Sequence, residues 1–134
     1  GFIFTTSIPP STAAGALRSV KILKVTPEKR VKHQERAEAL KDRFRLAGYD
    51  FIDGKTHIVP IMVGDPVKCQ AISDRLIEKF GIYAQPINFP TVPRGTERLR
   101  FTPSPFHDDV MMDNLMIALD SVWKEFGLDK KKVA

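Results

Sequence analysis

The sequence predicts an α+β fold, in which helices cover one face of a small, mostly antiparallel sheet. Three observations predict it: apolar residues recur at helical spacing in several segments, short β-type runs lie between them, and glycine or proline marks most boundaries. With 134 residues, 43% of them hydrophobic and 28% charged, the chain has the composition of a globular domain rather than of a disordered segment.

The first part of the chain predicts two helices. Residues 2–8 are apolar and β-capable, and a proline pair then leads into an alanine-rich helix over 11–23. A second helix begins with Thr26 as its N-cap and Pro27 at its first position, and Gly48 ends it. One face of this helix is apolar, with Ala37, Leu40, Phe44 and Ala47.

The middle of the chain predicts a strand followed by a helix. The strand covers 57–63, and Pro60 within it indicates an edge strand or a bulge. Asp65 predicts the N-cap of a helix over 66–80, which Gly81 ends. The core-facing residues of this helix are Cys69, Ile72, Leu76 and Phe80.

The last part predicts two strands and a final helix. A brief strand covers 82–85, and a second strand over 97–102 follows a proline-rich loop. Polar and apolar residues alternate in 97–102, so Arg98 and Arg100 project to the same face. The final helix covers 108–126, with Met111, Leu115, Ala118, Leu119, Val122 and Phe126 on its apolar face.

Charge and composition exclude several classes of function. The net charge is +5, but the basic residues are scattered except at the C-terminal lysines, which indicates a solvated surface rather than a nucleic-acid-binding groove. No apolar run approaches the length of a membrane span, and no signal peptide is visible. The single cysteine excludes an internal disulfide, and His33, His57 and His107 are too widely spaced for a metal site.

The stretch 88–105 carries the strongest signal of function, because four prolines and three arginines occur in eighteen residues. A stiff loop that leads to a fixed guanidinium can bind a carboxylate or a phosphate in one orientation. The alternative is an exposed loop followed by an edge strand with solvated charges. His107 is expected to help cap the final helix, and His33 to lie on a helix surface.

Four segments resemble a known family in its own order along the chain: 1–10, 57–66, 81–100 and 102–107. They resemble the C-terminal part of the α-oxoamine synthases, which are pyridoxal-phosphate (PLP) enzymes of the aspartate aminotransferase fold. The loop Asn-Phe-Pro-Thr-Val-Pro-Arg-Gly over 88–95 favours the 5-aminolevulinate synthases among them, in a form similar to the bacterial members.

The resemblance implies a role for five residues of this chain. Arg100 matches the arginine that pairs with the carboxylate of glycine, and Thr91 matches a residue that contacts the carboxylate end of succinyl-CoA. Arg94 matches a loop arginine near the acyl-CoA site. Thr5 and Thr6 match residues that reach the PLP phosphate of the partner subunit in the family's homodimer.

The resemblance also implies how the chain is organised. Residues 1–27 would end a large domain and connect it to a C-terminal small domain over 28–134. The chain opens on an apolar run without methionine, which indicates a piece of a longer protein. No lysine matches the one that forms the Schiff base with PLP, so this piece alone is expected to be inactive and to bind no PLP.

The parent enzyme implied by the resemblance condenses glycine with succinyl-CoA to 5-aminolevulinate, CoA and CO2, at the start of tetrapyrrole and heme biosynthesis. It would be cytoplasmic in a bacterium or in the mitochondrial matrix of a eukaryote, with no nucleic-acid or membrane partner. Two alternatives stay open: a sister α-oxoamine synthase that uses another amino acid or acyl-CoA, and a non-catalytic binding or assembly module of the same fold.

Overall fold

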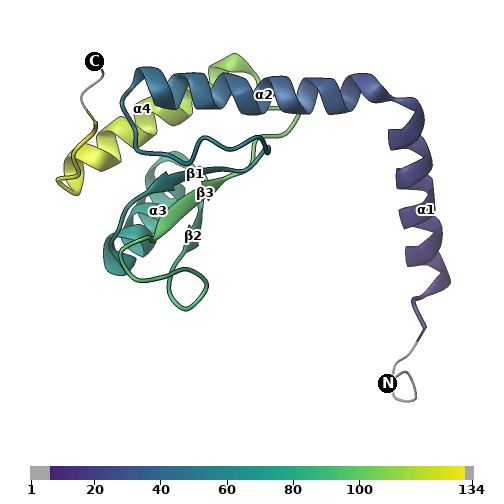
Figure 1. Ribbon diagram of the computed structural model, residues 1–134, viewed down its shortest axis with the longest axis horizontal. Coiled ribbons are helices and arrows are strands. Elements are labelled where there is room, and N and C mark those ends of the chain that lie inside the picture. Colours follow the sequence, from purple (N-terminus) through teal and green to yellow (C-terminus); the bar gives the residue numbers. More distant parts are fainter. Residues whose placement is uncertain (1–6, 132–134) are drawn as a thin grey trace.

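The computed structural model describes residues 7–131, which form four helices and one three-stranded sheet (Figure 1). The helices are α1 (Pro10–Val25), α2 (Pro27–Leu46), α3 (Pro66–Phe80) and α4 (Asp109–Glu125). The strands are β1 (Val59–Met62), β2 (Gln85–Ile87) and β3 (Arg98–Phe101). The α+β class predicted from the sequence is confirmed.

The sheet has the order β1-β3-β2, and β3 is antiparallel to both of its neighbours. Pro60 therefore lies in an edge strand, as predicted, because an edge tolerates the missing N–H of proline. The prediction for β2 was wrong by three residues at its start: the strand begins at Gln85, not at residue 82. Pro86 lies inside β2, and proline disfavours a strand when only the local sequence is considered. The strand forms because β2 is also an edge strand, which pairs with β3 on one side only.

One face of the sheet forms the core of the domain. Its residues Val59, Ile61, Leu99 and Phe101 are buried. The side chains that pack against them come from three helices: Leu40 and Phe44 of α2, Ile72 and Leu76 of α3, and Leu119 and Val122 of α4. On β3 the alternation holds as predicted, since Arg98 is half-buried and Arg100 is exposed on the other face.

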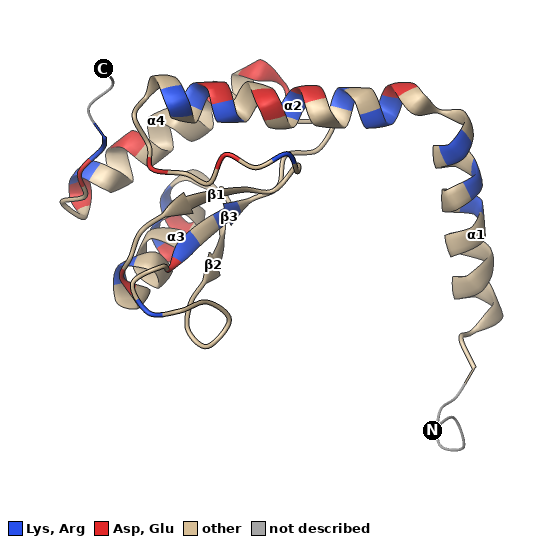
Figure 2. Ribbon diagram, in the orientation of Figure 1, with Lys and Arg blue, Asp and Glu red and all other residues tan. Residues whose placement is uncertain are grey.

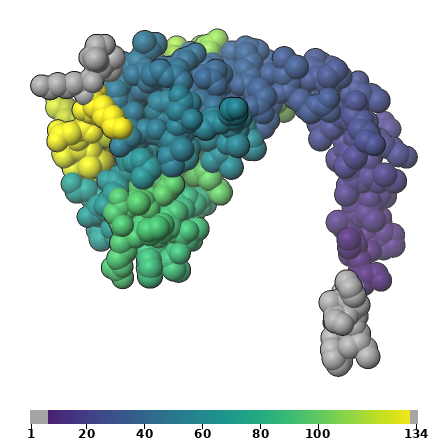
Figure 3. All heavy atoms as spheres, in the orientation of Figure 1, coloured from purple at the N-terminus to yellow at the C-terminus, as the bar shows by residue number. Residues whose placement is uncertain are grey.

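Helix α1 extends from the body of the domain as an arm (Figures 1 and 3). None of its residues is buried, and among the described elements it contacts α2 alone. Thr26 is the N-cap residue of α2, as predicted, but its side chain makes no capping hydrogen bond. Its Oγ1 donates instead to the carbonyl of Ile22 at 2.7 Å, at the end of α1. Pro27 does occupy the first position of α2.

Charged residues of both signs alternate along α2 (Figure 2), and only its second half reaches the core. There Ala37, Leu40 and Phe44 are buried, on the face that the sequence predicted. No helix within residues 7–131 is long and apolar enough to cross a membrane.

The ends of α3 follow the prediction. Asp65 Oδ1 accepts a hydrogen bond from the backbone N–H of Lys68 at 2.8 Å, which satisfies a donor of the first turn. Gly81 ends the helix in the left-handed conformation, with φ of +66°, where a side chain would be strained.

The buried face of α4 is wider than predicted. Met111 is 53% exposed, whereas Met112 and Trp123 are each 3% exposed. The helix packs against both α2 and α3, so residues on two sides of the predicted stripe reach the core. The predicted positions Ala118, Leu119 and Val122 are buried.

Candidate functional site: a pocket lined by Arg100 and His107

A pocket of about 500 Å³ lies where the end of β3, the segment before β2 and the first turns of α4 meet. Arg100 and His107 line it, together with Tyr83, Gln85 and Thr102. The rest of the wall is mainly apolar, with Leu40, Ile82, Phe101, Met111, Met112 and Leu115. A mainly apolar wall with a few convergent polar groups is typical of a small-molecule site.

Arg100 is held on the central strand and keeps its guanidinium available. Its neighbours across the sheet are Pro60 on β1 and Gln85 on β2. Among the residues that the structure describes, no carboxylate forms an ion pair with Arg100, whereas Arg36 and Arg43 are both paired. A guanidinium that projects from a paired strand and has no internal carboxylate partner suits an external carboxylate, which it can bind through two parallel hydrogen bonds.

His107 lies in a tight turn just before α4. Its ring Nδ1 accepts a hydrogen bond from the backbone N–H of Ser104 at 2.9 Å. The backbone N–H of His107 donates to the Ser104 carbonyl at 3.1 Å. The cap of α4 is instead Asp108, whose Oδ1 accepts from the N–H of Met111 at 2.8 Å, so the role predicted for His107 was wrong. With Nδ1 as an acceptor, the neutral ring carries its proton on Nε2, which remains a donor.

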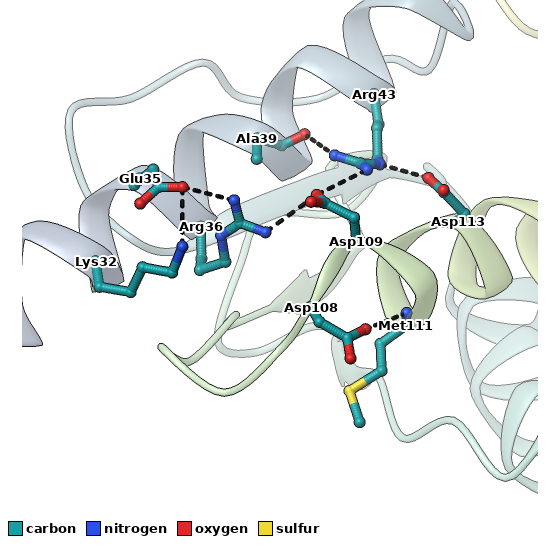
Figure 4. A network of polar contacts seen from close by, with 9 residues as sticks. All are labelled: Lys32, Glu35, Arg36, Ala39, Arg43, Asp108, Asp109, Met111 and Asp113. Carbon is teal, nitrogen blue, oxygen red and sulfur yellow. Dashed lines mark hydrogen bonds and ion pairs between the residues drawn. The ribbon is translucent and has the colours of Figure 1, made fainter.

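Ion pairs fix the start of α4, and with it one side of the pocket, against α2 (Figure 4). Arg36 and Arg43 each donate to Asp109 Oδ1 at 3.0 Å, and Arg43 Nε donates to Asp113 at 2.8 Å. The guanidinium of Arg43, and next that of Arg36, hold the pKa of Asp109 below its ordinary value. Asp109 is therefore an ionised partner of two arginines rather than a proton-transfer group.

A second contact ties the segment after Arg100 to α2. His33 was expected on the helix surface, but it is half-buried, and its Nε2 donates to the carbonyl of Pro103 at 3.0 Å. Its ring centroid lies 4.6 Å from that of His57. Within residues 7–131, no group of three His, Cys, Asp or Glu side chains is placed to hold a metal ion.

The proline-rich loop carries the other two predicted site residues within the described structure. Thr91 is exposed, and its N–H donates to the carbonyl of Asn88 at 3.0 Å. Arg94 is exposed too, with its guanidinium 4.7 Å from the centroid of the Phe89 ring, as in a cation–π contact. Neither residue lines the pocket that contains Arg100.

The structure therefore brings only part of the predicted site together. Arg100 and His107 share one pocket, and Thr91 and Arg94 lie on the loop that precedes β3. Thr5 and Thr6 lie outside the described residues. Arg100 is the cationic side chain of this pocket that could bind a carboxylate, and no lysine lines the pocket in the described part of the chain.

Cys69 is part of the core, as predicted. It is fully buried on α3, and its thiol donates to the carbonyl of Arg98 at 3.3 Å. Burial raises the pKa of Cys69 to about 11, so at neutral pH the thiol is protonated and unreactive.

Two residues near the site were missed from the sequence. Gln85 was assigned to the end of a strand, but it lies opposite Arg100 and lines the pocket. Glu97 is fully buried, and its position has the same parity as buried Leu99 and Phe101. The alternation of the strand could have indicated this from the sequence, because it places the Glu97 carboxylate on the same inward face as Leu99 and Phe101.

Comparison with known families gives one match that covers most of the chain. The aminotransferase class I and II family matches residues 1–119. Among curated proteins, 5-aminolevulinate synthase 1 of Cereibacter sphaeroides is 59% identical over 133 residues, which are 99% of this chain and 33% of that protein. The 5-aminolevulinate synthase of Paracoccus denitrificans is 53% identical over 100% of this chain and 33% of its own length.

Solved structures show the same fold. A serine palmitoyltransferase from S. paucimobilis, with bound PLP and myriocin, superposes with a TM-score of 0.84 at 26% identity, covering 94% of this chain and 32% of that one. A serine palmitoyltransferase from Sphingomonas wittichii gives 0.83 at 25% identity, over 94% of this chain and 32% of its own. The chain thus spans about a third of the length of the relatives that it matches.

Proposed function

This chain belongs to the aminotransferase class I and II family, and we propose that the protein containing it is a 5-aminolevulinate synthase. That protein condenses glycine with succinyl-CoA and releases 5-aminolevulinate, CoA and CO2. The proposal is supported by the 59% identity to the Cereibacter sphaeroides enzyme over 99% of this chain. The observation that carries it is the guanidinium of Arg100, which lines a pocket and has no carboxylate partner among residues 7–131.

Arg100 binds the carboxylate of glycine in this proposal. The side chain projects from the central strand, which pairs with a neighbour on each side, so the guanidinium starts from a fixed backbone. Binding both carboxylate oxygens limits rotation of the substrate and holds its α-carbon in one orientation. His107 Nε2 supplies a second donor in the same pocket.

Thr91 and Arg94 serve the second substrate. Thr91 donates its hydroxyl to the terminal carboxylate of succinyl-CoA, and Arg94 lies near the acyl-CoA site. Both side chains are exposed on the loop and neither lines the pocket of Arg100, so the terminal carboxylate of the acyl group would be bound apart from the carboxylate of glycine.

PLP, when bound, supplies the electron sink for negative charge at the substrate's α-carbon. Thr5 and Thr6 would donate their hydroxyls to its phosphate across the interface of a homodimer. The rest of the protein would contribute the lysine that binds the cofactor. Residues 1–27 end the large domain and connect it to the small domain of residues 28–134, and the arm of α1, which has no buried residue, supports this division. The bacterial relatives support a cytoplasmic location.

The test is a product assay with the purified full-length protein and PLP. Glycine, alanine and serine are each combined with succinyl-CoA and with a long-chain acyl-CoA, and both CoA release and the amino-ketone product are measured. We expect turnover to 5-aminolevulinate with glycine and succinyl-CoA only. Preference for another pair would identify a sister synthase, and no turnover with any pair would indicate a non-catalytic module.

A further inference from the structure

Glu97 is a fully buried carboxylate at the base of the proline-rich loop. Its side chain is 0% exposed, and its Oε2 accepts a hydrogen bond from the backbone N–H of Gly95 at 2.8 Å. The other oxygen, Oε1, is buried and has no hydrogen-bond partner among the described residues. A buried carboxylate with one unpartnered oxygen costs more free energy than a single hydrogen bond returns, so net stability does not explain this residue.

The effect of Glu97 is instead on the geometry of the loop. Its carboxylate closes a tight turn back onto Gly95, which has φ of +82° and directly follows Arg94. The backbone of Glu97 is fixed independently, because its carbonyl accepts from the N–H groups of Val63 at 2.9 Å and Gly64 at 3.0 Å. The hydrogen bond from the Gly95 N–H to the Glu97 side chain therefore joins the loop to a residue whose backbone is held by other contacts.

The opposite end of the loop has its own anchor. Asn88 Nδ2 donates to the carbonyl of Pro66 at 3.2 Å, and the Thr91 N–H donates to the Asn88 carbonyl at 3.0 Å. Thr91 and Arg94 thus lie between two fixed points, Asn88 and Gly95. The carboxylate of Glu97 holds the second point, next to a turn in which the N–H and Oγ1 of Thr96 donate to the Pro93 carbonyl at 3.1 and 2.7 Å.

Arg100 is positioned by different contacts. It belongs to β3, whose backbone pairs with β1 and β2 and whose residues Leu99 and Phe101 are buried. Loss of the bond between Glu97 and Gly95 would loosen the loop and leave the strand in place. We propose that Glu97 is a positioning residue that holds the loop of Thr91 and Arg94 for the acyl-CoA substrate, without contacting that substrate.

This inference rests on the proposed function, and three variants of the full-length protein test it. Glu97→Met keeps an unbranched side chain of similar size and removes both the charge and the acceptor for Gly95. Glu97→Gln keeps an acceptor oxygen and serves as the rescue. The matched control is Tyr49→Phe, which removes the hydrogen bond from a buried tyrosine to Asp120 elsewhere in the domain.

Glu97→Met is expected to raise the KM for succinyl-CoA about tenfold, because the hydrogen bond from Gly95 that orders the loop is lost. The KM for glycine should stay within about twofold, and Glu97→Gln should restore most of the loss. The melting temperature of Glu97→Met should be unchanged or raised, since replacing a buried charge by an apolar side chain is often neutral or stabilising. Equal changes in both KM values, or none, would overturn the proposal.

Hydrogen exchange at the amide of Gly95 gives a readout that needs no activity. It should be faster in Glu97→Met than in wild type and in Tyr49→Phe. If the wild-type protein makes no 5-aminolevulinate and this exchange difference is present, the proposed function fails and the role of Glu97 in the loop stands. An active enzyme without the exchange difference refutes the role of Glu97 alone.

Discussion

Arg100→Leu tests the central assignment, and the structure sets the size of the expected effect. An exposed ion pair contributes about 0–1 kcal/mol, whereas truncating one partner of a desolvated charge pair costs about 2–5 kcal/mol. Arg100 is exposed but lines a pocket of about 500 Å³ with mainly apolar walls, so bound glycine would be partly shielded from water. We therefore expect a loss of about 2–3 kcal/mol, which corresponds to about 30- to 150-fold weaker glycine binding.

The assay is a titration of the PLP-loaded full-length protein with glycine, followed through the absorbance of the cofactor. Arg98→Leu is the matched control, because Arg98 projects from the same strand to the same face, and its Nε donates to the Thr96 carbonyl at 2.8 Å. PLP content should be equal in wild type and both variants. Unchanged glycine affinity in Arg100→Leu, or an equal loss in Arg98→Leu, would refute the reasoning.

Three further predictions concern the loop, the helix interface and the core. Thr91→Val should lower the specificity constant for succinyl-CoA more than that for butyryl-CoA, since only the former offers a terminal carboxylate; equal losses would make Thr91 structural. Because folding lowers the pKa of Asp109, its ion pairs stabilise fully above the unfolded pKa, about 3.9, and are lost as pH falls through the folded pKa. Asp109→Asn should therefore lower the melting temperature at pH 7, and its difference from wild type should shrink as the pH falls through the folded pKa of Asp109. Cys69, buried and with a pKa of about 11, should react with iodoacetamide at pH 7.5 only as fast as the protein unfolds; rapid labelling of the native protein would contradict its place in the core.

The parts of the fold that were predictable from the sequence are those that local chemistry decides. Asp65 and Gly81 bound α3 because a side-chain acceptor and a left-handed glycine act within one turn of the chain. The alternation in β3 separates Leu99 from Arg100 because neighbouring residues of a strand face opposite sides. The same alternation places Arg98 and Arg100 on one face, and only the family resemblance singles out Arg100.

The parts that were not predictable depend on contacts between distant segments. The start of β2 is set by pairing of Gln85 with Arg100, fifteen positions away in the chain, against the local effect of Pro86. Met112 is buried because α4 packs on two helices at once, which a single helical stripe does not encode. His33 contacts the Pro103 carbonyl, seventy residues on, and no spacing within α2 indicates that partner.

The two predicted substrate-binding parts of the chain differ in what is needed to displace them. Moving Arg100 requires breaking backbone pairs on both sides of β3. The far end of the Thr91 loop is held by fewer bonds: Glu97 accepts from the Gly95 N–H, and the N–H and Oγ1 of Thr96 donate to the Pro93 carbonyl at 3.1 and 2.7 Å. Loop substitutions therefore act at a lower free-energy cost than strand substitutions. It follows that acyl-CoA selection can change by substitutions over 88–96 while binding of the amino acid is retained, and that changes in amino-acid selection need substitutions in the pocket walls around Arg100.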